Sequence, residues 1–420
     1  MTASTTHRAI DAVWRIESAR LIAGIARIVR DVGVAEELAH DALVAALEQW
    51  PESGVPENPG AWLMATAKHR AIDLLRRRER LGRKQEELGH GLLIRQNGAV
   101  ADLDAAIDDD IGDDLLGLVF ICCHPVLSTD ARVALTLRLL GGLTTREVAR
   151  AFLVPEATVA QRIVRAKRTL AEARVPFEVP GKGEWGDRLS SVLEVVYLVF
   201  NEGYSATAGD DWIRPALCED ALRLGRILAG LVPKEPEVQG LVALMEIQAS
   251  RLRARVGPSG EPVLLLDQDR GRWDHLLIRR GLAALERAEE LGGGLGTYTL
   301  QAEIAACHAR ARTPEETNWK RIVALYDALA QLMQSPVVEL NRAVAVGMAF
   351  GPEAGLELVD ELTSDPSLHG YHLLPSVRGQ LLVKLGRHDE ARAEFERAAS
   401  LTRNTREREL LLERAADCAR

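Results

Sequence analysis

Apolar residues recur every three to four positions along most of this chain, which is the period of an amphipathic α-helix. The clearest stripe is formed by Val159, Ile163, Ala166 and Leu170. Prolines and glycines break the pattern into stretches of about ten to twenty residues, a common helix length. Aromatic residues make up only 4% of the sequence, and Leu, Ala, Arg and Glu dominate. The pattern predicts an all-α protein.

The stripe at 159–170 belongs to a predicted helix-turn-helix motif. Thr144 and Glu147 have the spacing of a capping box, which marks a helix start. This first helix should end near Phe152, and Pro155 should close the turn, because proline fits the first turn of the next helix. The alternative is an ordinary helical hairpin with a charged exterior.

The solvent-facing side of the motif carries side chains that can contact DNA. In a helix-turn-helix motif the start of the second helix meets base edges, where Gln pairs with adenine and Arg with guanine. Lys167 and Arg168 lie further along, where phosphate contacts are expected. The candidate residues are Arg146, Glu156, Thr158, Gln161, Arg162, Arg165, Lys167 and Arg168.

A second cationic helix is predicted upstream, between Trp62 and Lys84. It holds eight basic and two acidic residues in a chain whose net charge is −9. A local cationic patch on an acidic protein indicates a specific nucleic-acid contact. The alternative is a solvated helix end whose arginines favour the helix dipole. The candidate residues are Trp62, Lys68, His69, Arg70, Asp73, Arg76, Arg77 and Arg80.

Charge and loop-forming residues predict five segments. Nine acidic residues oppose one arginine between 85 and 114, which indicates a linker that either keeps the chain soluble or competes with nucleic acid. The proline- and glycine-rich stretch 175–183 marks a second boundary. The expected parts are a helical domain at 1–84, the linker at 85–114, the helix-turn-helix domain at 115–175, and helical parts at 186–290 and 291–420.

The last part has the pattern of a tetratricopeptide repeat. Its small and bulky positions are Gly379, Leu382, Gly386, Ala391, Phe395 and Ala398. Arg403 stands where such repeats usually have proline. Because repeats bury their faces against neighbours, we expect a short helical solenoid. A single capping hairpin is the alternative.

Other signals argue against catalysis, metal binding and membrane insertion. The five cysteines are scattered, which indicates reduced thiols in the cytoplasm. Cys122-Cys123-His124 lacks a second ligand pair at zinc spacing, so no metal or other cofactor is expected. The segments around Glu202 and from Asp269 to Asp274 are interpreted as a buried turn and an ion-paired helix junction rather than catalytic sites. No apolar run of 18 residues is present.

Two stretches resemble bacterial sigma factors of the extracytoplasmic-function group. Residues 35–43, Trp50 and residues 62–80 resemble their second conserved region, and residues 124–170 resemble their fourth. The resemblance covers roughly residues 8–175. The segments 200–204, 216–225 and 268–274 resemble a subgroup with a long C-terminal extension that ends in tetratricopeptide-like helices. His40 and Leu43 depart from the usual Gln and Phe.

The resemblance implies a set of partners and roles. Core RNA polymerase would bind through its β′ clamp and β flap, and promoter DNA through −10 and −35 elements at the two cationic faces. The loop at 51–59 would hold a flipped −10 base. The extension would act on the DNA modules of its own chain or on another protein, without a separate anti-sigma protein. The residues expected at the clamp are Glu37, Leu38, Asp41 and Leu43, with Leu38, Leu43 and Leu47 partly internal.

Two other functions remain open from sequence alone. One is an operator-binding regulator whose C-terminal solenoid senses a ligand. It would account for the helix-turn-helix motif but leave residues 30–80 without a role. The other is an enzyme, but His308, His369 and His372 stand isolated and no acid–base cluster is visible.

Overall fold

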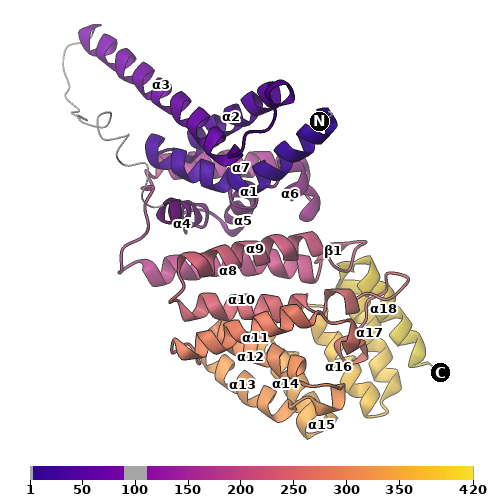
Figure 1. Ribbon diagram of the computed structural model, residues 1–420. Helices are drawn as coiled ribbons and strands as arrows, with labels where there is room; N and C mark the ends of the chain where they lie inside the picture. Colours follow the sequence, from indigo (N-terminus) through magenta and orange to yellow (C-terminus); the bar gives the residue numbers. More distant parts are fainter. Residues whose placement is uncertain (1–2, 89–110, 420) are drawn as a thin grey trace. The chain divides into compact units, whose positions relative to one another are not determined.

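The fold was analysed in a computed structural model that describes residues 3–88 and 111–419. The chain forms two compact units, Met1–Val195 and Val196–Arg420. The described residues are almost entirely helical, with strands limited to two residues each (Figure 1). The all-α prediction is confirmed.

The first unit contains seven complete helices among its described residues. Helix α1 packs against α2, α3 and α4, and α7 packs against α5 and α6. The bounds are α1 Ala3–Val29, α2 Val32–Ser53, α3 Pro59–Leu88, α4 Ile111–Cys122, α5 Thr129–Leu139, α6 Thr145–Ala151 and α7 Glu156–Glu172. The largest fully buried side chains here include Trp50, Phe120, Leu21 and Leu135.

The helix-turn-helix motif is present as the sequence predicts. Thr144 caps α6, and both hydrogen bonds of the capping box form with Glu147. Pro155 is the N-cap of α7. Leu153 in the turn has φ of 51°, a left-handed conformation that few side chains adopt. The four residues of the predicted apolar stripe on α7 are all buried.

Three boundaries in the first unit differ from expectation. The loop expected at 51–59 is shorter, because Pro51 lies inside the last turn of α2 and Pro59 begins α3. Helix α3 continues to Leu88, and α4 begins at Ile111. Asp114 is therefore helical and pairs with Arg27 at 3.2 Å instead of belonging to the acidic linker. The rest of that linker, residues 89–110, lies outside the described residues.

Helix α8, Trp185–Tyr204, contributes to both units. Its first half covers the helix-turn-helix module. Trp185 packs against Phe120 with ring centroids 5.2 Å apart, and Arg188 donates to the Phe120 carbonyl at 2.9 Å. The hydroxyl of Ser191 donates to the Cys123 carbonyl at 2.6 Å. The boundary between the units therefore lies beyond the proline- and glycine-rich stretch where the sequence placed it.

The second unit is built from successive antiparallel helix pairs (Figure 1). The longer helices are α9 Pro215–Leu231, α10 Pro236–Ala249, α11 His275–Glu290, α12 Thr297–Arg310, α13 Trp319–Leu332, α14 Pro336–Phe350, α15 Pro352–Leu362, α16 Leu373–Lys384, α17 His388–Leu401 and α18 Thr405–Asp417. Short 3-10 turns and the strands β1 Ala208–Gly209 and β2 Arg403–Asn404 connect them.

Helices α16 and α17 form the hairpin that the repeat pattern predicts. An added Cβ at Gly379 would approach the Phe395 ring to 3.0 Å, so any larger residue would force the ring to shift. Gly386 makes the turn with φ of 72°. Leu382, Ala391, Phe395 and Ala398 are buried in the same core.

The helix array closes on itself. Strands β1 and β2 pair in parallel, joining the loop after α8 to the last connection of the chain. The Asn404 side chain is fully buried and donates to the carbonyls of Ala206 and Asp211 at 3.1 and 2.8 Å. Thr405 also donates to Asp210 at 2.9 Å. These bonds tie the last connection of the chain to the loop after α8.

Two segments singled out in the sequence are structural. Glu202 is ion-paired with Arg214 and accepts from Thr207 at 2.9 Å, which agrees with the buried-turn interpretation. The ion-paired junction expected at 269–274 is wrong in detail. Asp269 accepts from the Gly271 amide, and Asp274 accepts from two amides as the N-cap of α11. The carboxylates therefore cap turns instead of pairing with arginines.

Arginine and aromatic side chains alternate in a stack at one end of α8 and α10. We call this stack the cation–π ladder, and its order is Trp212, Arg255, Tyr204, Arg251, Trp273 and Arg270. The Arg255 guanidinium lies 3.8 Å from the centre of the Tyr204 ring, and Arg251 lies 5.8 Å away. None of the three arginines has an ion pair within the described residues. The ring faces supply the stabilisation that carboxylates would otherwise give.

His308 lies close to the ladder in a buried position. Burial, together with the charges of Arg251 and Arg270, lowers the pKa of His308 to about 4. The imidazole is therefore neutral at neutral pH and adds no further positive charge to the ladder.

Replacing Tyr204 should separate the ring from its hydroxyl. Tyr204→Leu removes two cation–π contacts and should lower the free energy of unfolding of the full chain by about 1–3 kcal/mol. Tyr204→Phe is the matched control, because the buried hydroxyl has no hydrogen-bond partner among the residues that the structure describes. It should stay close to the parent. Urea unfolding followed by circular dichroism measures both, and equal stability of the two variants would contradict the ladder's role.

Candidate nucleic-acid and polymerase interface

Helix α7 presents most of its predicted DNA-contacting side chains to solvent. Arg146 on α6 and Glu156, Gln161, Arg165 and Arg168 on α7 are exposed, while Thr158 and Arg162 are half-buried. Arg162 is held by Asp130 of α5 at 2.8 Å, and Arg168 by Glu172 at 2.6 Å. Both carboxylates are well exposed, so these pairs are weak and exchange readily for a stronger anion.

The same face carries an apolar residue that the sequence analysis did not select. Val164 is 64% exposed between two cationic positions of α7. An exposed aliphatic group in a major-groove helix can contact the methyl group of thymine. The sequence could have indicated this exposure, because Val164 directly follows Ile163 and therefore lies outside the buried stripe.

The predicted DNA face of α3 is mostly exposed. His69, Asp73, Arg76, Arg77 and Arg80 are exposed, and Trp62, Lys68 and Arg70 are half-buried. Of the two nearby tryptophans, Trp50 is 1% exposed and contacts Trp62 edge-on, with centroids 5.3 Å apart. Trp62 and His69 are therefore the aromatic side chains of this face that a base could reach.

Helix α2 presents part of the expected clamp surface. Glu37 and Asp41 are exposed and Leu43 is half-buried. Leu38 is only 6% exposed and packs in the core, so it is not available to a partner. Leu47, expected to be partly internal, is 38% exposed, and Val44 beside it is 50% exposed. Asp41 pairs with Arg70 of α3 at 3.4 Å, which links the clamp surface to the cationic helix.

A buried carboxylate connects α2 to the helix-turn-helix module. The side chain of Glu36 is 6% exposed and accepts from Arg138 of α5 at 2.8 Å and from Lys167 of α7. Arg138 also contacts the His40 ring at 3.0 Å and donates to the Leu143 carbonyl at 3.1 Å. We call Glu36, His40, Arg138 and Lys167 the Glu36 cluster. His40 stands where the family usually has glutamine, and this histidine is part of the contact between the two modules.

The electrostatics of the cluster favour an ionised Glu36. Burial alone would raise the pKa of this carboxyl, but Lys167, Arg138 and His40 outweigh burial and hold it below its ordinary value of 4.5. The carboxylate is therefore charged at neutral pH and tied to two cations. As a consequence Lys167, a predicted phosphate contact, points toward α2 instead of outward.

Comparisons with known proteins also divide the first unit into two modules. Residues 16–81 match Sigma-70 region 2, and residues 118–170 match Sigma-70, region 4. The chain belongs to the sigma-70 family. It resembles the extracytoplasmic-function type with a C-terminal extension, and residues 188–289 of that extension match a family of unknown function, DUF6596. Members of the sigma-70 family are transcription initiation factors rather than enzymes.

One curated relative of this sigma-70 protein covers nearly its whole length. It is an uncharacterized protein of Rhizobium meliloti (strain 1021), 45% identical over 382 residues, which are 91% of this chain and 89% of the relative. No solved structure matches the chain. Within the described residues, none of the helices combines the length and apolar character needed to cross a bilayer. The same residues contain no cluster of three or more potential metal ligands.

Neutralising Glu36 should loosen the contact between α2 and α7. Glu36→Gln leaves Lys167 and Arg138 without their buried counter-ion and should cost about 3 kcal/mol of unfolding free energy. Glu37→Gln is the matched control, because its side chain is exposed on the next position of the same helix. In the parent the same stabilisation is present above pH 4.5 and is lost as pH falls through the lowered pKa of Glu36.

Denaturant titrations at neutral and acidic pH measure both effects. The difference between parent and Glu36→Gln should shrink in acid, while Glu37→Gln follows the parent throughout. A Glu36→Gln variant as stable as the parent at neutral pH would show that the cluster does not hold the modules together.

Proposed function

We propose that this sigma-70 protein binds core RNA polymerase in the cytoplasm and directs it to promoters by recognising −10 and −35 elements. The observation that carries the proposal is the pair of separate cationic faces, on α3 and on α6–α7, within segments that match regions 2 and 4. In this assignment α3 contacts the −10 element, and α7 reads the −35 element. The family resemblance also suggests a contact between the region 4 module and the β flap.

The clamp contact is assigned to the outer face of α2. Glu37 and Asp41 provide the charge, and Leu43 and Val44 provide apolar surface beside them. Val44 replaces Leu38 in this proposal, because Leu38 is buried. Since Asp41 also pairs with Arg70, a change at Asp41 would disturb both the clamp and the −10 surfaces. Glu37 forms no ion pair within the described residues, and its charge reversal is the cleaner probe of polymerase binding.

Promoter opening is assigned to the start of α3. Flipping a base out of the duplex costs a few kcal/mol, and stacking on an aromatic side chain returns about 1–3 kcal/mol. With Trp50 buried, Trp62 and His69 are the aromatic groups left for this purpose. A face with so few aromatic groups melts DNA weakly, which favours stringent promoter choice.

The second unit is proposed to regulate the first. Because it is covalently attached, it acts at high effective concentration next to both DNA modules. Helix α8 supports this idea, since it covers Phe120 of the region 4 module with its first half and continues into the second unit. An operator-binding regulator is the competing function, but it leaves the exposed acids of α2 and the cationic face of α3 unused.

Base reading by α7 can be separated from phosphate binding. Arg162→Ala should relax preference at one −35 position and cost about 1–3 kcal/mol on the preferred promoter. Arg168→Ala should weaken all promoters alike and lower the salt slope by about one. Arg168 is a better control than Lys167, because Lys167 also holds the Glu36 cluster.

The measurement is run-off transcription by reconstituted polymerase on a promoter library. Equal losses on every promoter for Arg162→Ala would exclude base readout by this residue. Two outcomes would favour the operator-binding alternative. In one, the parent chain does not bind core polymerase; in the other, core polymerase with the parent chain makes no transcript from any promoter.

Regulation by the second unit predicts an effect of truncation. A chain ending at Val195 should change run-off transcription several-fold while promoter preference stays the same. A cut at Pro180 would be misleading, because it removes Trp185, Arg188 and Ser191 from the region 4 core. Loss of activity means that the extension braces the DNA modules, and gain means that it masks them.

The control is circular dichroism of the truncated chain, which should show the helical content expected from its remaining helices. Unchanged transcription by a folded truncated chain would contradict regulation and leave the extension as a docking module for another protein.

A further inference from the structure

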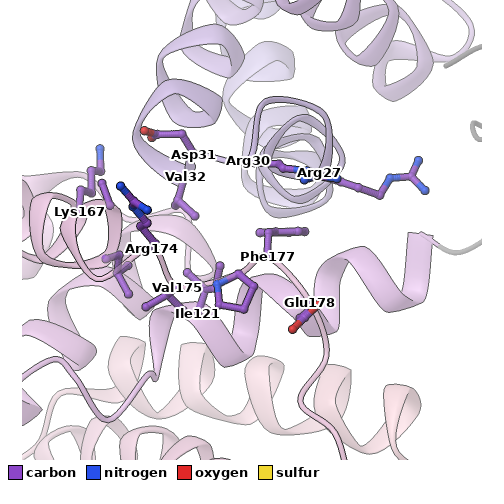
Figure 2. A pocket seen from close by; sticks show the side chains of 13 residues that line it. Arg27, Arg30, Asp31, Val32, Ile121, Lys167, Arg174, Val175, Phe177 and Glu178 are labelled. Carbon is purple, nitrogen blue, oxygen red and sulfur yellow. The ribbon is translucent and has the colours of Figure 1, made fainter. Parts of the chain in front are cut away.

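The first unit contains a pocket of about 540 Å³ between its two DNA modules (Figure 2). One wall comes from the turn between α1 and α2, and the opposite wall from the end of α7 and the segment after it. The lining residues include Arg27, Arg30, Asp31 and Val32 on one side and Lys167, Arg174, Phe177 and Glu178 on the other. Its volume is in the range of small-molecule sites.

Two of the pocket's arginines have an uncommon backbone conformation. Arg30 and Arg174 have φ of 54° and 49°, and in the described part of the chain only one other non-glycine residue, Leu153, has positive φ. A left-handed residue is a common way for a helix to end, and glycine usually occupies that position. Arg30 follows the end of α1 and Arg174 follows the end of α7, and at both places the chain turns toward the pocket.

The charge of the pocket is unbalanced. Arg27 is paired with Asp114, and Lys167 with Glu36. Arg30 and Arg174 make no side-chain hydrogen bond or ion pair within the described residues. Of the two acids in the lining, Asp31 already accepts the Val34 amide as the N-cap of α2. Glu178 is exposed, as are Arg30 and Arg174 themselves, and it forms no ion pair with either arginine within the described residues. Two guanidinium groups are left to face an anion.

The rest of the lining is apolar and includes an aromatic ring. Phe177 lies near the middle of the view in Figure 2, below Arg30 and Arg27, and Pro176 also lines the pocket. The aliphatic lining residues are Val32, Ile121, Leu170 and Val175. Arginine binds phosphate and carboxylate groups through paired hydrogen bonds, and the apolar wall suits a flat hydrocarbon body.

We propose that this pocket binds a small organic anion, a phosphate or carboxylate head group on an apolar body. The head group lies between Arg30 and Arg174, and the body lies against Phe177 and the aliphatic wall. Because region 2 supplies one wall and region 4 the other, the bound anion holds the two modules together in the arrangement that keeps Lys167 on Glu36. This consequence for transcription rests on the proposed sigma function, whereas binding itself does not.

Binding is tested by calorimetry on the full chain, with naphthyl phosphate and naphthoate as probes for the two head groups. Inorganic phosphate tests the head group without the body. The variant Arg30→Gly/Arg174→Gly removes both charges, and glycine adopts positive φ without strain, so the turns are kept. Arg279→Ala, an exposed arginine of α11 in the second unit, is the control for general loss of positive charge.

At least one naphthyl probe should bind the parent and the Arg279→Ala control with equal affinity. Its affinity for the double glycine variant should be at least about tenfold lower. Arg30→Lys/Arg174→Lys should recover part of the affinity, because it restores the charge but not the paired hydrogen bonds. Absence of binding by both naphthyl probes, or equal binding to the glycine variant, overturns the proposal. Inorganic phosphate binding as tightly as the naphthyl probes overturns the role of the apolar wall.

The effect on the modules is tested by run-off transcription with the same probe. It should inhibit the parent several-fold and leave the double glycine variant unaffected. Calorimetric binding without any inhibition overturns the holding role while leaving the anion site standing. If the parent directs no transcription even without the probe, the proposed sigma function fails, and the calorimetric result still decides the site.

Discussion

The buried carboxylate of Glu36 is the constraint on which the first unit depends. Removing a carboxylate from water costs several kcal/mol, and only close, well-oriented cations offset that cost. Arg138 and Lys167 supply them from two helices of the region 4 module, while the carboxylate comes from region 2. Both modules therefore contribute charged groups that depend on this contact for their ion-pair partners. If they separate, either water or another partner must satisfy all three charged groups.

This constraint changes the meaning of Lys167. Its position on α7 predicts a phosphate contact, and its place in the structure gives it a carboxylate partner instead. If Lys167 contacts phosphate in the proposed function, it must leave Glu36, and DNA and Glu36 would compete for one ammonium group. Arg162 and Arg168 differ, because their partners Asp130 and Glu172 are exposed and exchange at little cost.

The sequence predicted those features that follow from local periodicity and capping. The four buried positions of α7 and the Thr144–Glu147 capping box follow from rules that span fewer than a dozen residues. It could not predict pairs such as Glu36 with Lys167, which are 131 residues apart, because any exposed carboxylate would have fitted equally well. The same limit applies to Asn404, which closes the second unit through the Asp211 carbonyl 193 residues away.

The Glu36 cluster sets a threshold for opening rather than a block. A binding partner shifts a two-state equilibrium only by the difference between its affinities for the two states. In the proposed function, a promoter and a polymerase surface would bind α3, α7 and the outer face of α2. Their affinity would favour the separated modules if Lys167 must leave Glu36 to contact phosphate, and further phosphate contacts would add to that difference. An anion between Arg30 and Arg174 acts in the opposite direction, because its site exists only when both walls meet. In the proposed function, the level of transcription would then depend on the sum of these differences, and a cluster worth a few kcal/mol lies in the range where either partner can decide it.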